Sequence, residues 1–216
     1  MKIFKVILAS GLVLATLTAC APKTETSQTE TQNNQNVISQ TNPPATMQTI
    51  PEKGDTIAIL TTNMGEIKVL LYTKDVPETA KNFAELAKAK KYDGTIFHRV
   101  INNFMIQGGD FENRNGTGGY SYKGKGTSLK DEINPALSHF RGAVSMANSG
   151  PNTSGSQFFI VQNPQGAKYL DGGYSLFGFA YEGMDVVDKI ATTQTNAGDK
   201  PLKDIVLEKV EIKTQE

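Results

Sequence analysis

Few side chains in this sequence can serve as a nucleophile, a general base or a metal ligand. The chain has one cysteine, Cys20, and two histidines, His98 and His139. Ser154 and Ser156 lie outside any Gly-x-Ser-x-Gly elbow, so a Ser-His-Asp triad stays open without positive support. Two histidines with neither paired cysteines nor a His-Glu-x-x-His pattern argue against a metal site. We therefore expect no bound metal and no cofactor.

One glycine-rich stretch matches a phosphate-binding loop only in part. Gly119 and Gly124-Lys125 have the spacing of that motif, but Gly126 stands where a Ser or Thr should bind Mg²⁺. No hydrophobic strand precedes the stretch, so we do not expect a nucleotide site. The chain carries 22 basic and 22 acidic residues, and this balance gives no reason to expect nucleic acid as a partner.

The N-terminus has the parts of a bacterial lipoprotein signal peptide. Lys2 and Lys5 precede an apolar run over residues 6–17. That run has about 12 residues, fewer than the roughly 20 that cross the hydrocarbon core of a bilayer. Leu17-Thr18-Ala19-Cys20 then resembles the lipobox, in which cleavage occurs before a cysteine that carries the lipid. We expect residues 1–19 to be the signal peptide and Cys20 to anchor an extracytoplasmic protein to the cell membrane, or to an outer membrane where one exists.

The rest of the chain divides into a polar segment and one domain. Residues 20–54 are rich in Thr, Gln, Asn and Ser and contain no aromatic residue, so they cannot bury enough apolar surface to offset the entropy of ordering. We expect them to form a disordered tether. Residues 55–216 have the size of a single domain with one core.

The domain must supply the elements that position any functional side chain. An alternating pattern over residues 56–72 predicts a hairpin, and Pro77 with an apolar stripe at helical spacing predicts a helix up to about residue 87. A second helix is expected over residues 184–191. Further strands are expected at residues 95–100, 104–107, 143–146, 157–161, 176–179 and 205–212. Many short strands with two helices indicate an all-β domain, either a closed antiparallel barrel or a sandwich.

Three segments closely resemble the signatures of the cyclophilin family. They are residues 97–110 (FHRVINNFMIQGGD), 145–159 (SMANSGPNTSGSQFF) and 169–178 (YLDGGYSLFG), in the family's order and spacing. The resemblance covers essentially all of residues 55–216. It implies a closed eight-stranded antiparallel barrel with a helix at each open end, filled by side chains and with its active site on the outer face. It also implies a monomeric peptidyl-prolyl cis-trans isomerase whose substrates are proline-containing polypeptides.

The resemblance assigns roles to particular residues. Arg99, Phe104, Gln107 and Asn148 fall at the catalytic positions. The substrate-binding positions are Met105, Gly116, Ala147, Ser149, Gln157, Phe159, Tyr169, Leu170 and Tyr174. Without the family resemblance, an aromatic strand residue such as Phe159 would more often belong to the core than to a site. An Arg between apolar neighbours would commonly be a surface residue. His98 is expected to be structural, because it should point away from its strand neighbour Arg99.

Two positions depart from the eukaryotic pattern. Tyr169 and Tyr174 replace the Trp and His of many eukaryotic members, so we expect isomerase activity to persist while cyclosporin binds weakly. The main hypothesis is an enzyme that assists the folding of exported proteins at the membrane surface. The alternatives are a chaperone that binds proline segments and a surface interaction protein, each with little turnover.

Overall fold

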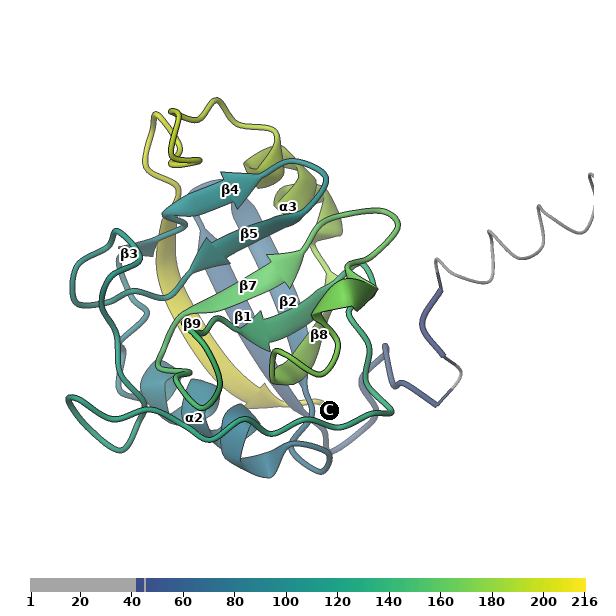
Figure 1. The fold of residues 1–216 in the computed structure, drawn as a ribbon. Coiled ribbons are helices and arrows are strands. Elements are labelled where there is room, and N and C mark those ends of the chain that lie inside the picture. Colours follow the sequence, from purple (N-terminus) through teal and green to yellow (C-terminus); the bar gives the residue numbers. More distant parts are fainter. Residues whose placement is uncertain (1–41, 45) are drawn as a thin grey trace, which may run out of the picture.

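The computed structural model describes residues 42–44 and 46–216 and shows one curled antiparallel sheet with a helix at each end (Figure 1). The nine strands are β1 (Thr56–Thr62), β2 (Gly65–Leu71), β3 (Thr95–Ile96), β4 (Arg99–Ile101), β5 (Met105–Gly108), β6 (Ala143–Met146), β7 (Phe158–Val161), β8 (Leu176–Glu182) and β9 (Val206–Thr214). The helices are α2 (Pro77–Lys88), α3 (Met184–Ala191) and the short 3₁₀ turn η1 (Lys168–Leu170). The expected mostly-β architecture with two capping helices is confirmed.

The β1–β2 hairpin opens the domain, and its turn explains its register. Thr62 pairs with Gly65, and the Thr62 hydroxyl accepts a hydrogen bond from the Met64 backbone N–H and donates one to the Gly65 carbonyl. Gly65 has a φ of 135°, which residues with a side chain rarely adopt. The hairpin is extended on one side by β9 and on the other by β8.

The sheet has nine strands where the sequence pattern led us to expect eight. The expected strand at residues 95–100 divides at Phe97 and His98 into β3 and β4. β3 pairs with β9, and β4 pairs with β5, so the two pieces lie at opposite ends of the strand order. Phe97 and His98 therefore connect the two edge strands of the curled sheet, β3 and β4.

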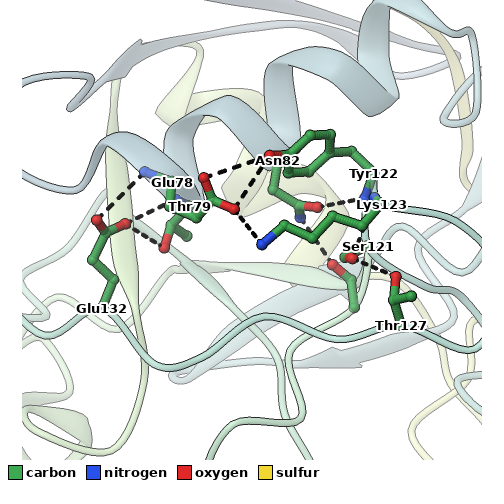
Figure 2. Close-up of polar contacts among 9 residues, drawn as sticks. Glu78, Thr79, Asn82, Ser121, Tyr122, Lys123, Thr127 and Glu132 are labelled. Atoms are coloured by element: carbon green, nitrogen blue, oxygen red, sulfur yellow. Dashed lines mark hydrogen bonds and ion pairs between the residues drawn. The ribbon is translucent and has the colours of Figure 1, made fainter.

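Helix α2 covers one end of the sheet, and α3 covers the other (Figure 1). Pro77 begins α2, and the predicted stripe of Ala80, Phe83, Ala84 and Ala87 is buried. The N-cap residue, Val76, has no side-chain group that could cap the helix. The Glu132 carboxylate caps it instead by accepting hydrogen bonds from the backbone N–H groups of Glu78 and Thr79, as Figure 2 shows. A negative group at this end is favoured by the helix dipole.

A second contact ties α2 to the long loop that precedes β6 and to the segment between β6 and β7. Asn82 is fully buried, and its side chain donates to the Gly155 carbonyl and accepts from the Tyr122 backbone N–H (Figure 2). The Tyr122 hydroxyl donates to Glu78, which also pairs with Lys123 at 2.6 Å. These bonds hold an irregular loop against a regular helix, so the loop can form one wall of a site.

The interior of the sheet is filled by aromatic and aliphatic side chains. Phe83, Tyr92 and Phe158 are fully buried, and Phe158 meets both other rings edge-on at 5.3 and 5.6 Å. Strand alternation places the next residue, Phe159, on the opposite face of β7. The core therefore occupies the inside of the curl, and a site on this sheet must use its outer face.

The N-terminal part of the described chain contacts the domain before residue 55. Met47 is 4% exposed and belongs to the core, and the Tyr72 hydroxyl donates to the Gln48 carbonyl at 2.5 Å. The expected signal peptide at residues 1–19 and the anchoring residue Cys20 lie outside the described residues. Within the part that the structure does describe, no helix has both the length and the apolarity to cross a bilayer.

Candidate active site

The site begins at the β4–β5 hairpin, where Arg99 and Gln107 are directly opposite each other. The chain turns at Asn103, which adopts a left-handed φ of 59°, a conformation that Asn tolerates better than most residues. Val100 is buried between exposed Arg99 and half-buried Ile101. The hairpin thus directs the Arg99 guanidinium and the Gln107 amide to the same outer face.

A cavity of about 170 Å³ lies on this face. It is lined by Arg99, Phe104, Met105, Gln107, Ala147, Asn148, Phe159, Leu170 and Tyr174. All nine are predicted site residues, and they come from β4, the turn after it, β5, β7, the segment after β6, and the region around η1. The structure therefore brings the four catalytic candidates and five of the nine binding candidates to one place.

The floor of this cavity is apolar. Met105, Phe159 and Leu170 are at least 91% buried, and the Tyr174 ring meets Phe159 edge-on at a centroid distance of 5.5 Å. Phe104 closes the rim. Such a pocket accepts a compact apolar ring and excludes water from it.

A second cavity of about 440 Å³ adjoins the first and shares Gln107, Ala147 and Asn148 with it. Three more binding candidates, Gly116, Ser149 and Gln157, line this second cavity. Tyr169 lines neither cavity. Its side chain is 73% exposed, and its ring lies 6.1 Å from that of Phe104 at the rim.

A row of amide groups connects the two cavities. Gln107 Nε2 donates to Gln157 Oε1 at 3.0 Å, and Gln157 Nε2 donates to the carbonyls of Gly116 and Gly118. In the described residues no hydrogen bond joins Gln107 to Arg99, and the Gln107 Nε2 is directed to Gln157.

Asp110 fixes the loop to which Gln157 binds. This carboxylate is fully buried and accepts hydrogen bonds from the backbone N–H groups of Glu112, Asn113, Asn115, Gly116 and Gly118. Burial alone would raise the pKa of Asp110, but these donors hold it below the ordinary value. The loop is therefore built around a negative charge.

His98 packs behind the loop at Gly116. A Cβ atom on Gly116 would come within 3.0 Å of the His98 ring, and the φ of 91° would strain any residue with a side chain, so glycine is favoured there. His98 is 5% exposed, and burial lowers its pKa. Neither ring nitrogen has a hydrogen-bond partner within the described residues. Arg99 is exposed while His98 is buried, as expected for neighbours that face opposite ways.

Arg99 has a partner that the sequence did not suggest. Asp199, in the loop between α3 and β9, places its carboxylate 3.7 Å from Arg99 Nε. The Asp199 carbonyl accepts a hydrogen bond from the Val100 backbone N–H at 2.8 Å, which docks the loop on β4. Asn196 shapes the loop by accepting from the N–H groups of Gly198 and Lys200. The two charged residues are 100 positions apart, and no local pattern connects them.

Asn148 is held by the protein on both sides of its amide. Its Nδ2 donates to the Gly173 carbonyl at 2.9 Å, and its Oδ1 accepts from the Gly150 N–H. The Asn148 side chain is thus engaged within the protein. Ser156, considered above as a nucleophile, is buried and donates to the Gly109 carbonyl.

Comparison with known proteins identifies the class. Residues 56–212 match the family model described as cyclophilin type peptidyl-prolyl cis-trans isomerase/CLD, and the chain therefore belongs to that family. It is a peptidyl-prolyl cis-trans isomerase of the cyclophilin type.

Individual relatives agree with the family match. The chain is 49% identical to "Peptidyl-prolyl cis-trans isomerase CYP18-1" of Arabidopsis thaliana over 71% of this chain and 93% of the relative. It is 46% identical to human "Peptidyl-prolyl cis-trans isomerase-like 1" over 68% and 86% of the two chains. A crystal structure of a Cryptosporidium parvum cyclophilin type isomerase superimposes with a TM-score of 0.70 at 34% identity, covering 75% of this chain and 99% of that one.

Proposed function

We propose that this isomerase acts on X-Pro bonds of exported polypeptides, at the surface of a membrane to which Cys20 anchors it. The observation that carries the catalytic part is the 170 Å³ cavity, where an apolar floor meets one guanidinium at its rim. The anchoring part rests on the lipobox-like sequence at residues 17–20.

The chemistry requires no bond to the substrate. Rotation about an X-Pro bond breaks amide resonance, against a barrier of roughly 18–20 kcal/mol. In the twisted transition state the prolyl nitrogen regains its lone pair and becomes a hydrogen-bond acceptor. A fixed cationic donor aimed at that nitrogen stabilises the twisted state more than the planar one. No nucleophile or proton transfer is needed.

Each group in the cavity has a part in this mechanism. The floor of Met105, Phe159 and Leu170 holds the proline ring and excludes water. Arg99 donates to the prolyl nitrogen, and the planar guanidinium can do so while its Nε faces Asp199. The backbone of Asn148 holds the residue before proline. For a rate gain of about 10⁵-fold these effects together must supply about 7 kcal/mol.

The membrane anchor is tested by replacing the proposed lipidated residue. We expect the full chain, expressed in bacterial cells, to incorporate labelled palmitate and to sediment with membranes. Cys20→Ser should abolish both while leaving the isomerase activity of the domain unchanged, because Cys20 lies outside the described domain. A Cys20→Ser chain that still carries the label and sediments with membranes would contradict the proposal.

The alternative is a binding chaperone with little turnover. A protein that only binds proline segments has no use for a donor directed at the prolyl nitrogen. The presence of Arg99 at the rim of the cavity therefore favours the enzyme.

A further inference from the structure

The second histidine of the sequence belongs to a hydrogen-bond network beside the site, buried at Ser145 and reaching the surface at Asp171. His139 is 1% exposed, and its Nδ1 lies 2.6 Å from the Asp171 carboxylate. Its Nε2 lies 2.8 Å from the hydroxyl of Ser145, on β6. The Asp171 carboxylate also accepts from the His139 backbone N–H and from the Ser138 hydroxyl. This set is a Ser-His-Asp array in which Ser145 lies six residues after His139 and Asp171 lies 32 residues after it.

The array cannot act as a hydrolytic triad. Ser145 is fully buried, so no substrate carbonyl can reach its hydroxyl. Ser154 and Ser156, the serines considered from sequence, make no hydrogen bond to His139 in the described residues. The role of the array must therefore lie in what it holds in place.

His139 lies against two of the residues that line the 170 Å³ cavity, Phe159 and Tyr174. Its ring is nearly parallel to that of Phe159, with centroids 6.1 Å apart and an interplanar angle of 14°, and it meets Tyr174 edge-on at 6.5 Å. Phe159 is paired with Ser145 across β6 and β7. Asp171 directly follows Leu170, so its bond to His139 anchors the segment that supplies both Leu170 and Tyr174.

We infer that His139 is a positioning residue for the proline pocket, and that its neutral form holds the segment around η1 against β6 and supports Phe159. The inference rests on the proposed pocket. His139 acts through Phe159, Leu170 and Tyr174 and has no contact with the reacting bond.

The hydrogen bonds assign a protonation state. The Asp171 carboxylate requires a donor, so the hydrogen of neutral His139 is on Nδ1, and Nε2 accepts from the Ser145 hydroxyl. A proton added at Nε2 removes this acceptor and forces the buried Ser145 hydroxyl to reorient. Two titratable side chains face the His139 ring, namely the charged carboxylate of Asp171 and the phenol of Tyr174. β6 contributes the Ser145 hydroxyl and β7 contributes the Phe159 ring, neither of which carries a charge. Burial lowers the pKa of His139, and Asp171 opposes that effect only in part.

Acidification should therefore loosen the pocket before it unfolds the domain. Because burial lowers the pKa of His139, the native enzyme takes up this proton only at a pH below the ordinary value of 6.5. We expect kcat/KM for a blocked alanyl-prolyl peptide, which has no titrating group, to fall on the acid side of that value.

The two histidines of the chain allow a matched test. The pH profile of kcat/KM is measured by NMR exchange for the wild type, His139→Gln and His98→Gln. We expect kcat/KM to fall at low pH, which is the acid limb of the profile, in the wild type and in His98→Gln. His139→Gln should show a flat profile, with kcat/KM at pH 7.5 lowered about tenfold, the equivalent of one buried hydrogen bond. An acid limb that persists in His139→Gln, or that disappears in His98→Gln, overturns the inference.

Further variants separate positioning from loss of fold. Asp171→Asn keeps the size of the side chain, and Thr62→Val removes a buried hydrogen bond in the β1–β2 turn, away from the pocket. We expect Asp171→Asn to raise the Kd of the peptide and Thr62→Val to leave it unchanged at similar stability. Equal Kd values for Asp171→Asn and the wild type contradict the inference. Failure of the proposed function has a different signature, namely unchanged activity in Arg99→Ala.

Discussion

At the scale of single residues, the site depends on how one guanidinium is directed. Arg99 and Asp199 are each a little under half exposed, with side-chain exposures of 45% and 44%, so their ion pair is screened by solvent. Asp199 is nevertheless the acidic group that pairs with Arg99 Nε in the described residues. A pair at Nε restricts the guanidinium and leaves its terminal N–H groups for the cavity that Arg99 lines.

Asp199→Asn should therefore lower kcat more than it raises KM. The expected loss is about two- to fivefold, because an ion pair of this exposure contributes up to about 1 kcal/mol. Asp199→Glu should recover part of the rate, and high salt should reduce the difference between wild type and Asp199→Asn. NMR exchange kinetics at two salt concentrations measure kcat and KM for the wild type and both variants. A change in KM alone would assign Asp199 to substrate binding.

Tyr169 tests the rim of the site. Its exposed ring lies beside Phe104 and offers a hydroxyl where a tryptophan would offer an indole N–H and more apolar area. We expect the wild type to bind cyclosporin weakly and Tyr169→Trp to bind it about tenfold more tightly, with isomerase activity unchanged. Calorimetric titration of both proteins provides the comparison. A tight complex with the wild type would contradict this prediction.

At the scale of elements, distant segments stabilise those that carry the site. Helix α2 has no cap of its own and uses Glu132, which is more than 50 residues further along the chain (Figure 2). Glu132→Ala should lower the free energy of unfolding by about 1 kcal/mol, the usual effect of losing a helix cap. Urea unfolding measures it, with the exposed Glu208→Ala as the control. Equal losses in both variants would mean that Glu132 does not cap α2.

The sequence predicted the elements better than their connections. Alternation and helical spacing identified the hairpin, both long helices and most strands, because each depends on residues close in sequence. The division of residues 95–101 into β3 and β4 depends on pairing with β9 on one side and β5 on the other. Local pattern carries no such information.

The same limit applies to the site. The family signatures identified the nine residues that line the 170 Å³ cavity. The signatures could not identify Asp199 or the Ser145–His139–Asp171 array. The carboxylates of Asp199 and Asp171 lie 100 and 32 residues from Arg99 and His139, and carboxylates are too common on protein surfaces to be singled out by residue type.

At the scale of the whole molecule, buried titratable groups set the response to acid. Burial lowers the pKa values of both His98 and His139 from 6.5, so the unfolded chain binds protons that the native one does not. The pKa of Asp110 is held below its ordinary value of 3.8 by backbone donors. Its stabilising contribution is present above that value and is lost as pH falls through the folded pKa.

We therefore expect the free energy of unfolding to be level near pH 8 and to decline in two stages. The first decline begins below about pH 6.5 from the histidines, and the second begins below about pH 3.8 from Asp110. Urea unfolding across this range, repeated on His98→Gln and His139→Gln, measures the first stage. A first stage of undiminished size in both variants would show that other groups produce it.

The central claim is that Arg99 at the rim of an apolar pocket accelerates rotation about the X-Pro bond. It is tested most directly by NMR exchange measurements of cis-trans rates in a proline peptide, with the wild type, Arg99→Ala and the control Arg114→Ala. We predict that Arg99→Ala loses about a hundredfold or more of the catalysed rate, because a donor to the transition state contributes about 2.7 kcal/mol or more. The unfolding midpoint of Arg99→Ala should match that of the wild type, and Arg114→Ala should retain full activity. Equal rates for the wild type and Arg99→Ala would contradict the account.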